Sequence, residues 1–325
     1  MKHLKLISLL CAAVTVLAGC SAFSKKPLSY TDTAFDTVIS VQIYDAVDQS
    51  VLEKCKTICQ DYEAKFSRTI ETSEISKINA AGGAPVTVSD ETARLIKKGI
   101  YYGDLSDGAL DITIGAVSRL WDFKTETAAV PASESISEAL SHVDYRKIHI
   151  SDHTVTLEDP MAAIDLGAIA KGYIADRLKD YLESQGVRHA LINLGGNVLA
   201  IGAKPDGSSY HIGIPKPFDK DNTILTSLKV KDQSIVTSGT YQRYFEADGT
   251  RYHHILDPST GYPSNHGLNS VTIITDSSLT ADALSTTCFV LGPEKGMKLI
   301  NQLDNVDAVF VNEKNEISYS RNFQK

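Results

Sequence analysis

Four segments of this 325-residue chain combine residue types that could bind a phosphate group or a cation. In the first, residues 164–172, a predicted strand ends at Asp165, Gly167 allows a tight exit, and a predicted helix follows. A helix N-terminus offers free backbone N–H groups to an anion, and Lys171, one turn in, is within reach of a phosphate. The order of residues around Lys171 is not that of a P-loop. The plainer alternative is a surface helix with Asp165 as its N-cap.

The second segment, residues 193–197, carries the glycine pair Gly195 and Gly196 after a predicted strand. Paired glycines let a backbone approach a ligand closely, but they also form ordinary turns. The third segment spans residues 237–261 and contains His253, His254 and an Asp-Pro turn among several aromatic residues. This composition suggests a pocket, although both histidines could equally be exposed strand residues.

The fourth segment, residues 280–286, places Asp282 and Thr286 four residues apart, so they share one face of a predicted helix. One carboxylate with hydroxyl and carbonyl oxygens forms a hard-oxygen site that Mg²⁺ accepts, with substrate phosphates completing the octahedron. The alternative is a solvent-facing helix start. Together the four segments indicate a phosphate-bearing ligand, a divalent cation and little covalent machinery, because the motifs of serine hydrolases, zinc proteases and dinucleotide folds are absent from the sequence.

Apolar periodicity predicts the elements that position these segments. Helices are expected over residues 48–66, 89–102, 115–121, 168–183 and 279–291. Strands are expected over residues 34–44, 147–157, 161–166, 308–318 and in several pieces between 190 and 236, while 71–79 and 124–142 are expected to be polar connections. Because the strands and helices do not alternate regularly, the pattern favours an α+β fold over a doubly wound sheet.

The N-terminus has the pattern of an exported bacterial lipoprotein. A short basic start and about a dozen apolar residues fit a signal peptide of residues 1–19, too short to span a bilayer comfortably. Small residues before Cys20 resemble a lipobox, which predicts an acylated Cys20, a tether over residues 20–29 and an extracytoplasmic protein anchored to the cell membrane. The alternative is an ordinary secretory signal. Cys55 and Cys59 lie on a helical stripe and are expected to be small core residues, and no disulfide framework is evident.

The charge pattern excludes one class of partner. The net charge is −8, and no stretch gathers Lys and Arg into a long run. An acidic surface repels polyanions, so no nucleic acid is expected as a partner.

The order of the motifs resembles the ApbE family, whose members are FAD:protein FMN transferases. The motifs are Gly108-Ala109-Leu110-Asp111-Ile112-Thr113-Ile114-Gly115, Asp165-Leu166-Gly167-Ala168-Ile169-Ala170-Lys171-Gly172, Asn193-Leu194-Gly195-Gly196-Asn197, Ser238-Gly239, His254-Ile255-Leu256-Asp257-Pro258-Ser259-Thr260-Gly261 and Thr280-Ala281-Asp282-Ala283-Leu284-Ser285-Thr286. The resemblance begins at about Tyr30. It implies one catalytic domain over residues 30–325, with mixed sheets and helices around a central site for FAD and Mg²⁺.

The resemblance also implies roles for individual residues. Mg²⁺ would be held by the Ala168 carbonyl, Asp282 and Thr286. His254 would serve in catalysis, and Gly195 and Gly196 would approach the ligand. FAD would contact the remaining family positions, which are Phe35, Ala109, Leu110, Asp111, Asp165, Lys171 and Leu256. The sequence departs from the family at Phe35-Asp36-Thr37, where methionine-glycine-threonine is commoner, at Gly115-Ala116-Val117, where glycine-proline is usual, and at Asn197, where an acid is frequent.

The resemblance implies Mg²⁺-dependent transfer of FMN from FAD to a Thr or Ser hydroxyl of an acceptor redox protein, with release of AMP. The alternatives are a Mg²⁺-dependent FAD pyrophosphatase, a non-catalytic flavin-binding lipoprotein and a solute-binding lipoprotein. Ser238-Gly239-Thr240 lacks the full acceptor pattern, so modification of the chain by itself is not indicated.

Overall fold

An eight-stranded sheet forms the centre of the fold, and each neighbouring pair of its strands is antiparallel. The computed structural model describes residues 26–123, 128–219, 221 and 223–323. In spatial order the strands are β1 (Leu28–Ala34), β2 (Thr37–Ile43), β6 (Ala190–Leu194), β7 (Asn197–Ile201), β10 (Ser234–Gly239), β13 (Leu268–Thr275), β14 (Asp307–Asn312) and β15 (Ile317–Tyr319).

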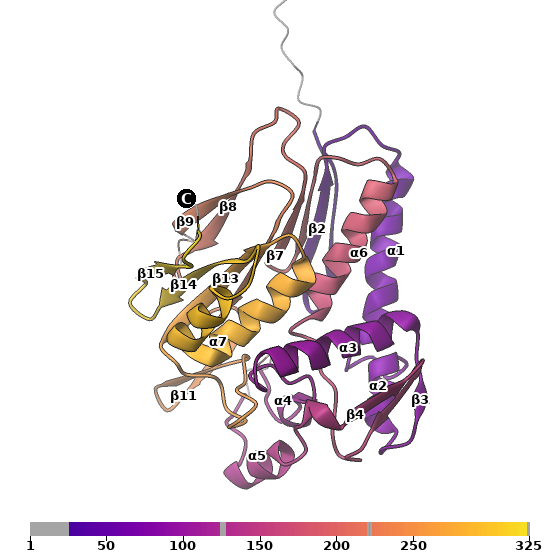
Figure 1. The fold of residues 1–325 in the computed structure, drawn as a ribbon, viewed down its shortest axis with the longest axis vertical. Helices are drawn as coiled ribbons and strands as arrows, with labels where there is room; N and C mark the ends of the chain where they lie inside the picture. Colours follow the sequence, from indigo (N-terminus) through magenta and orange to yellow (C-terminus); the bar gives the residue numbers. More distant parts are fainter. Residues whose placement is uncertain (1–25, 124–127, 220, 222, 324–325) are drawn as a thin grey trace, which may run out of the picture.

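Three long helices pack together on this sheet: α1 (Gln49–Phe66), α6 (Ala170–Ser184) and α7 (Ser278–Ile300) (Figure 1). The central strand β13 is buried along its whole length, which explains its unbroken run of apolar and small polar residues. A hairpin of β8 (Tyr210–Pro215) and β9 (Ile224–Val230) packs on the sheet through a second apolar cluster. The three helices and this hairpin therefore cover the main sheet. Packing against the sheet fixes the positions of α6 and α7.

A smaller group of elements lies beside the helices in Figure 1. It contains α2 (Glu74–Ala80), α3 (Asp90–Leu105), α4 (Gly115–Ser118), α5 (Ser133–Leu140) and a short helical turn η1 (Tyr145–Lys147). Its three-stranded sheet has the order β3 (Val86–Thr87), β5 (Thr154–Leu157), β4 (Ile148–Ser151). A separate hairpin of β11 (Tyr244–Ala247) and β12 (Thr250–His253) packs against Trp121, whose indole N–H donates to the Gly261 carbonyl at 3.0 Å.

The predicted α+β class is confirmed, as are the long helices near 48–66, 89–102, 168–183 and 279–291. Helix α1 starts after Asp48, whose side chain accepts from the Ser50 N–H and caps the helix. Cys55 and Cys59 are buried and free, as expected of core residues. The described residues contain no helix long and apolar enough to cross a membrane.

Several predicted elements were wrong in detail. Residues 161–166 form no strand. Their backbone bonds to side chains and makes an isolated bridge instead of pairing along a neighbouring strand. The strand predicted over 147–157 is a hairpin that turns at Asp152, and the helix predicted up to Trp121 is the single turn α4. The polar connections contain α2 and α5, and β1 begins at Leu28, so its first two residues lie in the expected tether. The signal peptide, Cys20 and residues 21–25 lie outside the described residues.

Candidate functional site

Helices α6 and α7 cross at a glycine. A Cβ atom added to Gly172 would lie 2.3 Å from the Ser278 carbonyl oxygen and 2.7 Å from the Asp282 Cβ. Only glycine therefore allows this approach, which places the Gly172 N–H 2.9 Å from Asp282 Oδ2. Asp176, one turn further along α6, accepts from the Ser278 N–H at 2.7 Å and the Leu279 N–H at 3.0 Å. An α6 carboxylate thus caps α7 and fixes its start against α6.

Asp282 is a buried carboxylate, with a side chain only 3% exposed. Burial raises the pKa of the Asp282 carboxyl, while the nearby Lys171 ammonium, the Gly172 N–H and the Asn197 amide oppose that rise. The Asn197 side-chain nitrogen is buried, and within the described residues it has no hydrogen-bond partner that meets normal geometry. Burial thus works against the ionised form of this carboxylate, and a bound cation would compensate for that cost.

The Thr286 hydroxyl, one turn after Asp282, belongs to a cluster of three hydroxyl groups with Ser238 and Ser285. Ser238 at the end of β10 lies 2.8 Å from the Ser285 hydroxyl and 3.2 Å from the Thr286 hydroxyl. Ser285 Oγ in turn donates to the Asp282 carbonyl at 2.9 Å. No group of three or more His, Cys, Asp or Glu side chains within the described residues is placed to hold a metal. A cation at Asp282 would therefore need hydroxyl, carbonyl and ligand oxygens, the set that Mg²⁺ accepts.

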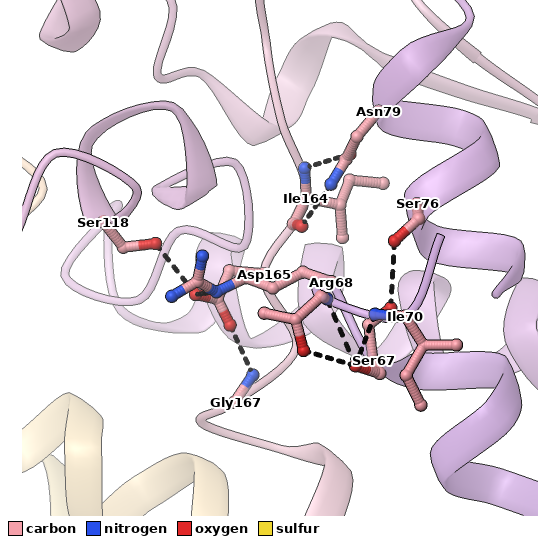
Figure 2. Close-up of polar contacts among 10 residues, drawn as sticks. Ser67, Arg68, Ile70, Ser76, Asn79, Ser118, Ile164, Asp165 and Gly167 are labelled. Carbon is pink, nitrogen blue, oxygen red and sulfur yellow. Dashed lines mark hydrogen bonds and ion pairs between the residues drawn. The ribbon is translucent and has the colours of Figure 1, made fainter. Parts of the chain in front are cut away.

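The loop before α6 is organised around Asp165, as Figure 2 shows. Asp165 Oδ2 pairs with Arg68 Nε at 2.9 Å and accepts from the Ser118 hydroxyl at 2.9 Å. The other oxygen, Oδ1, accepts from the Gly167 N–H at 2.9 Å. Asp165 therefore joins the chain after α1, the helix α4 and the loop that leads into α6.

A side-chain amide replaces a strand partner at the same loop. Asn79 of α2 donates to the Ile164 carbonyl at 2.9 Å and accepts from the Ile164 N–H at 2.7 Å (Figure 2). These two bonds satisfy the backbone of a residue that we expected in a strand. Helix α6 begins at Ala170 and has no side-chain cap, so Asp165 is not its N-cap. Lys171 lies in the first turn, and its Nζ donates to the Gly167 carbonyl at 3.2 Å.

His254 follows β12 and is half-buried. Its Nδ1 lies 3.3 Å from the Arg243 carbonyl oxygen. Because a carbonyl only accepts, Nδ1 carries the proton and Nε2 keeps its lone pair. Burial, with the charges of Arg243 and Lys171 nearby, lowers the pKa of His254 to about 3. His254 is therefore neutral at physiological pH, with Nε2 as an acceptor.

Phe35 and Asp36 form the turn between β1 and β2 in the left-handed region, with φ of 55° and 58°. The Phe35 N–H donates to Glu63 Oε1 at 2.7 Å, and Arg243 Nη2 donates to the Asp36 carbonyl at 3.1 Å. This turn therefore lies next to the residue that holds the His254 ring. Left-handed backbone is unfavourable for Phe, so these two bonds help to hold the turn.

Gly195 and Gly196 differ in what surrounds them. Gly195 has a φ of +66°, and an added Cβ would lie 2.3 Å from Thr37 Cγ2, so packing against β2 requires glycine there. Gly196, with φ +98°, is exposed, and an added Cβ would meet only Gln242 Nε2 at 3.8 Å. Only Gly196 has open space on which a ligand could lie.

Asp111 is buried, and its carboxylate accepts hydrogen bonds from other residues of the protein. It accepts from the Thr113 N–H and hydroxyl at 2.7 and 2.6 Å, and from the Tyr145 N–H at 3.0 Å. Burial raises the pKa of the Asp111 carboxyl, and these bonds oppose the rise. A depression of about 200 Å³ lies over Asp111 and Pro258. The segment around Ala109 and Leu110 therefore adjoins the segment that follows Leu256.

The structure brings Lys171, Asp282, Thr286 and His254 into one neighbourhood, since the Lys171 charge acts on both Asp282 and His254. Ala168 is half-buried in the loop held by Asp165 and Asn79. Sequence reasoning missed Arg68, Asn79 and Asp176 as parts of the site, and it gave no role to Asn197, Ser238 or Ser285, although all three stand in the quoted motifs. The motifs were thus a signal for Asn197, Ser238 and Ser285, whereas Arg68, Asn79 and Asp176 lie outside every quoted motif.

Comparison with known proteins identifies the family of the chain. The model of the ApbE family matches residues 35–310, and the chain belongs to the ApbE family. It is 36% identical to a Treponema pallidum protein named FAD:protein FMN transferase, with 88% of this chain and 84% of the relative covered. A Klebsiella pneumoniae protein of the same name is 39% identical, with 90% and 91% covered.

Solved structures give the same family. The ApbE protein of Thermotoga maritima superposes with a TM-score of 0.85 at 35% identity, covering 91% of this chain and 97% of that one. The flavin transferase ApbE of Vibrio cholerae superposes with a TM-score of 0.80 at 28% identity, covering 90% and 96%. The fold expected from the resemblance is confirmed.

Proposed function

We propose that this chain transfers FMN from FAD to a Thr or Ser hydroxyl of an acceptor protein, in a Mg²⁺-dependent reaction that releases AMP. Its relatives in Treponema pallidum and Klebsiella pneumoniae are named FAD:protein FMN transferases, and they match most of the chain. The observation that carries the proposal is the buried Asp282 carboxylate at the crossing of α6 and α7, beside Thr286 and Lys171.

The residues present fit a Mg²⁺ ion. Asp282 and Thr286 lie on one face of α7, and the Ala168 carbonyl belongs to the loop that precedes α6. The ion would supply positive charge to the pyrophosphate oxygens of FAD. Lys171, in the first turn of α6, would pair with the same pyrophosphate.

His254 is our candidate for proton removal from the acceptor hydroxyl. The Arg243 carbonyl fixes its tautomer, which leaves Nε2 free to accept that proton. The acceptor oxygen then forms a bond to the FMN-side phosphorus, the pyrophosphate P–O bond breaks, and AMP leaves with the bonding electrons. The protein residues thus orient the two substrates and receive one proton.

We further propose that FAD contacts Phe35, the 109–111 segment, Asp165, Gly196 and Leu256. The Phe35 turn is linked through Arg243 to His254, and the 109–111 segment adjoins the one that follows Leu256. Asp165 is already held by Arg68, Ser118 and Gly167, so it would present a fixed carboxylate edge to the ligand. We also propose that Cys20 carries the lipid anchor, which would place the enzyme beside extracytoplasmic redox proteins as acceptors.

The test is incubation of the purified protein with FAD, Mg²⁺ and a candidate acceptor, followed by intact-mass analysis. The proposal predicts that the acceptor gains the mass of one FMN unit and that AMP appears in equal amount. Release of FMN and AMP with an unmodified acceptor would instead identify an FAD pyrophosphatase. Binding of FAD without any product would identify a non-catalytic flavin-binding protein, and no binding would leave a solute-binding lipoprotein.

A further inference from the structure

The hydroxyl groups of Thr286, Ser238 and Ser285 form a chain that ends on the Asp282 backbone carbonyl, and its proton direction can be assigned. Ser285 Oγ donates to the Asp282 carbonyl at 2.9 Å, which uses its only proton. The 2.8 Å contact between Ser285 and Ser238 therefore requires Ser238 to be the donor. Ser238 then has no proton left, so the 3.2 Å contact with Thr286 requires Thr286 to be the donor.

This order decides which side of the Thr286 oxygen is available. The proton of Thr286 points toward Ser238, so both lone pairs of Oγ1 point away from that contact and remain free. A hydroxyl oxygen binds a cation through such lone pairs, and a proton turned toward the cation would oppose binding. This chain of hydroxyl groups runs from Thr286 on α7 through Ser238 on β10 to Ser285 on α7, so it also links the two elements.

We propose that Ser238 and Ser285 are positioning residues that orient the Thr286 hydroxyl oxygen toward the divalent cation. The inference rests on the proposed function, because it assumes a cation at Asp282 and Thr286. Partners that hold a metal ligand in place change metal affinity by about 10–100-fold when they are removed. Neither serine needs to touch the cation or the substrate.

A matched control lies next to Ser238 on β10. Thr237 Oγ1 pairs with the Thr272 hydroxyl at 2.8 Å, and the two residues are cross-strand partners on β10 and β13. The change Thr237→Val therefore removes a hydroxyl–hydroxyl bond of the same kind from the same strand. It leaves the hydrogen bonds that run from the Thr286 hydroxyl to the Asp282 carbonyl intact.

The experiment is a calorimetric titration of the purified proteins with Mg²⁺ at saturating FAD, together with thermal unfolding without metal. Ser238→Ala should weaken Mg²⁺ binding by about 10–100-fold, whereas Thr237→Val should change it by less than about twofold. Ser238→Thr keeps the hydroxyl and should restore binding. A purely structural role would instead lower the melting temperature of Ser238→Ala and Thr237→Val alike and leave Mg²⁺ affinity unchanged.

Ser285→Ala provides an independent variant, because Ala is favourable inside a helix and is expected to fold. It should also weaken Mg²⁺ binding, and the double variant with Ser238→Ala should be no weaker than Ser238→Ala alone, since both belong to one chain. Unchanged Mg²⁺ affinity in Ser285→Ala and in folded Ser238→Ala would overturn the inference. Absence of Mg²⁺ binding by the unaltered protein would overturn the proposed metal dependence itself, so the two failures are distinguishable.

Discussion

Replacement of Gly172 by Ala should damage the proposed cation site through backbone geometry alone. The added Cβ would lie 2.3 Å from the Ser278 carbonyl, whereas real Cβ contacts essentially never fall below 3.0 Å. The backbones of α6 and α7 must therefore separate by at least about 0.7 Å at this point. Overpacking of this kind costs about 1–3 kcal/mol, and the helix propensity of Ala returns about 1 kcal/mol. The net loss of unfolding free energy should not exceed about 2 kcal/mol.

The same separation stretches the 2.9 Å bond between the Gly172 N–H and Asp282. Loss of a bond that orients a metal ligand should weaken Mg²⁺ binding by about 10–100-fold. The assay is a Mg²⁺ titration at saturating FAD, with chemical denaturation measured in parallel. Gly213→Ala on β8 is the control, because the nearest atoms to its Cβ would be those of the Ile224 side chain on the paired strand β9. A folded Gly172→Ala protein that binds Mg²⁺ as tightly as the unaltered one would refute the reasoning.

Three further outcomes are expected. Burial lowers the pKa of His253 to about 4, so only the unfolded chain gains a proton as the pH falls below 6.5. Stability should therefore decline between about pH 6.5 and pH 4, and denaturation of His253→Gln should show a shallower decline. His254→Gln should lower the FMN transfer rate by about 10²–10⁴-fold with little change in FAD affinity, measured by mass spectrometry and fluorescence. In the unaltered enzyme, an acid limb of kcat/KM near pH 6.5 that His254→Gln abolishes would contradict the lowered pKa. Burial raises the pKa values of Cys55 and Cys59 to about 12 and about 11, so a thiol reagent should label neither in the native protein and both after denaturation.

Elements with strong local signals could be predicted from sequence. Helix α1 has an Asp cap, an apolar stripe and 18 residues, and its prediction at 48–66 was accurate. The start of α3 was also predicted, because Ser89 is a capping residue directly before an apolar periodic segment, and the predicted start of α7 at residue 279 lies one residue after the observed one. The predicted end of this helix at Leu291 coincides with the non-helical backbone of Gly292, and a second helical piece, which was not predicted, continues α7 to Ile300.

Elements that depend on distant partners could not be predicted. Residues 161–166 look like a strand locally, yet Ile164 bonds to the Asn79 side chain, 85 residues earlier. Strand β1 has a mixed polar sequence and exists because it pairs with β2. Local periodicity contains no information about such partners.

The candidate site also contains features that local sequence predicts and features that depend on distant partners. Asp282 and Thr286 could be proposed from a four-residue helical spacing. The need for glycine at position 172 follows from contact with residues more than 100 positions away, and the Ser238 chain joins β10 to α7. These parts emerge only when the elements are assembled.

The most direct test of the account is the affinity of the purified protein for FAD, measured by flavin fluorescence with and without Mg²⁺. The account predicts that Mg²⁺ tightens FAD binding by the unaltered protein and has no such effect on Asp282→Asn, a change that keeps the shape of the side chain and removes its charge. Equal FAD affinity with and without Mg²⁺ in the unaltered protein, or a full Mg²⁺ effect in Asp282→Asn, would contradict it.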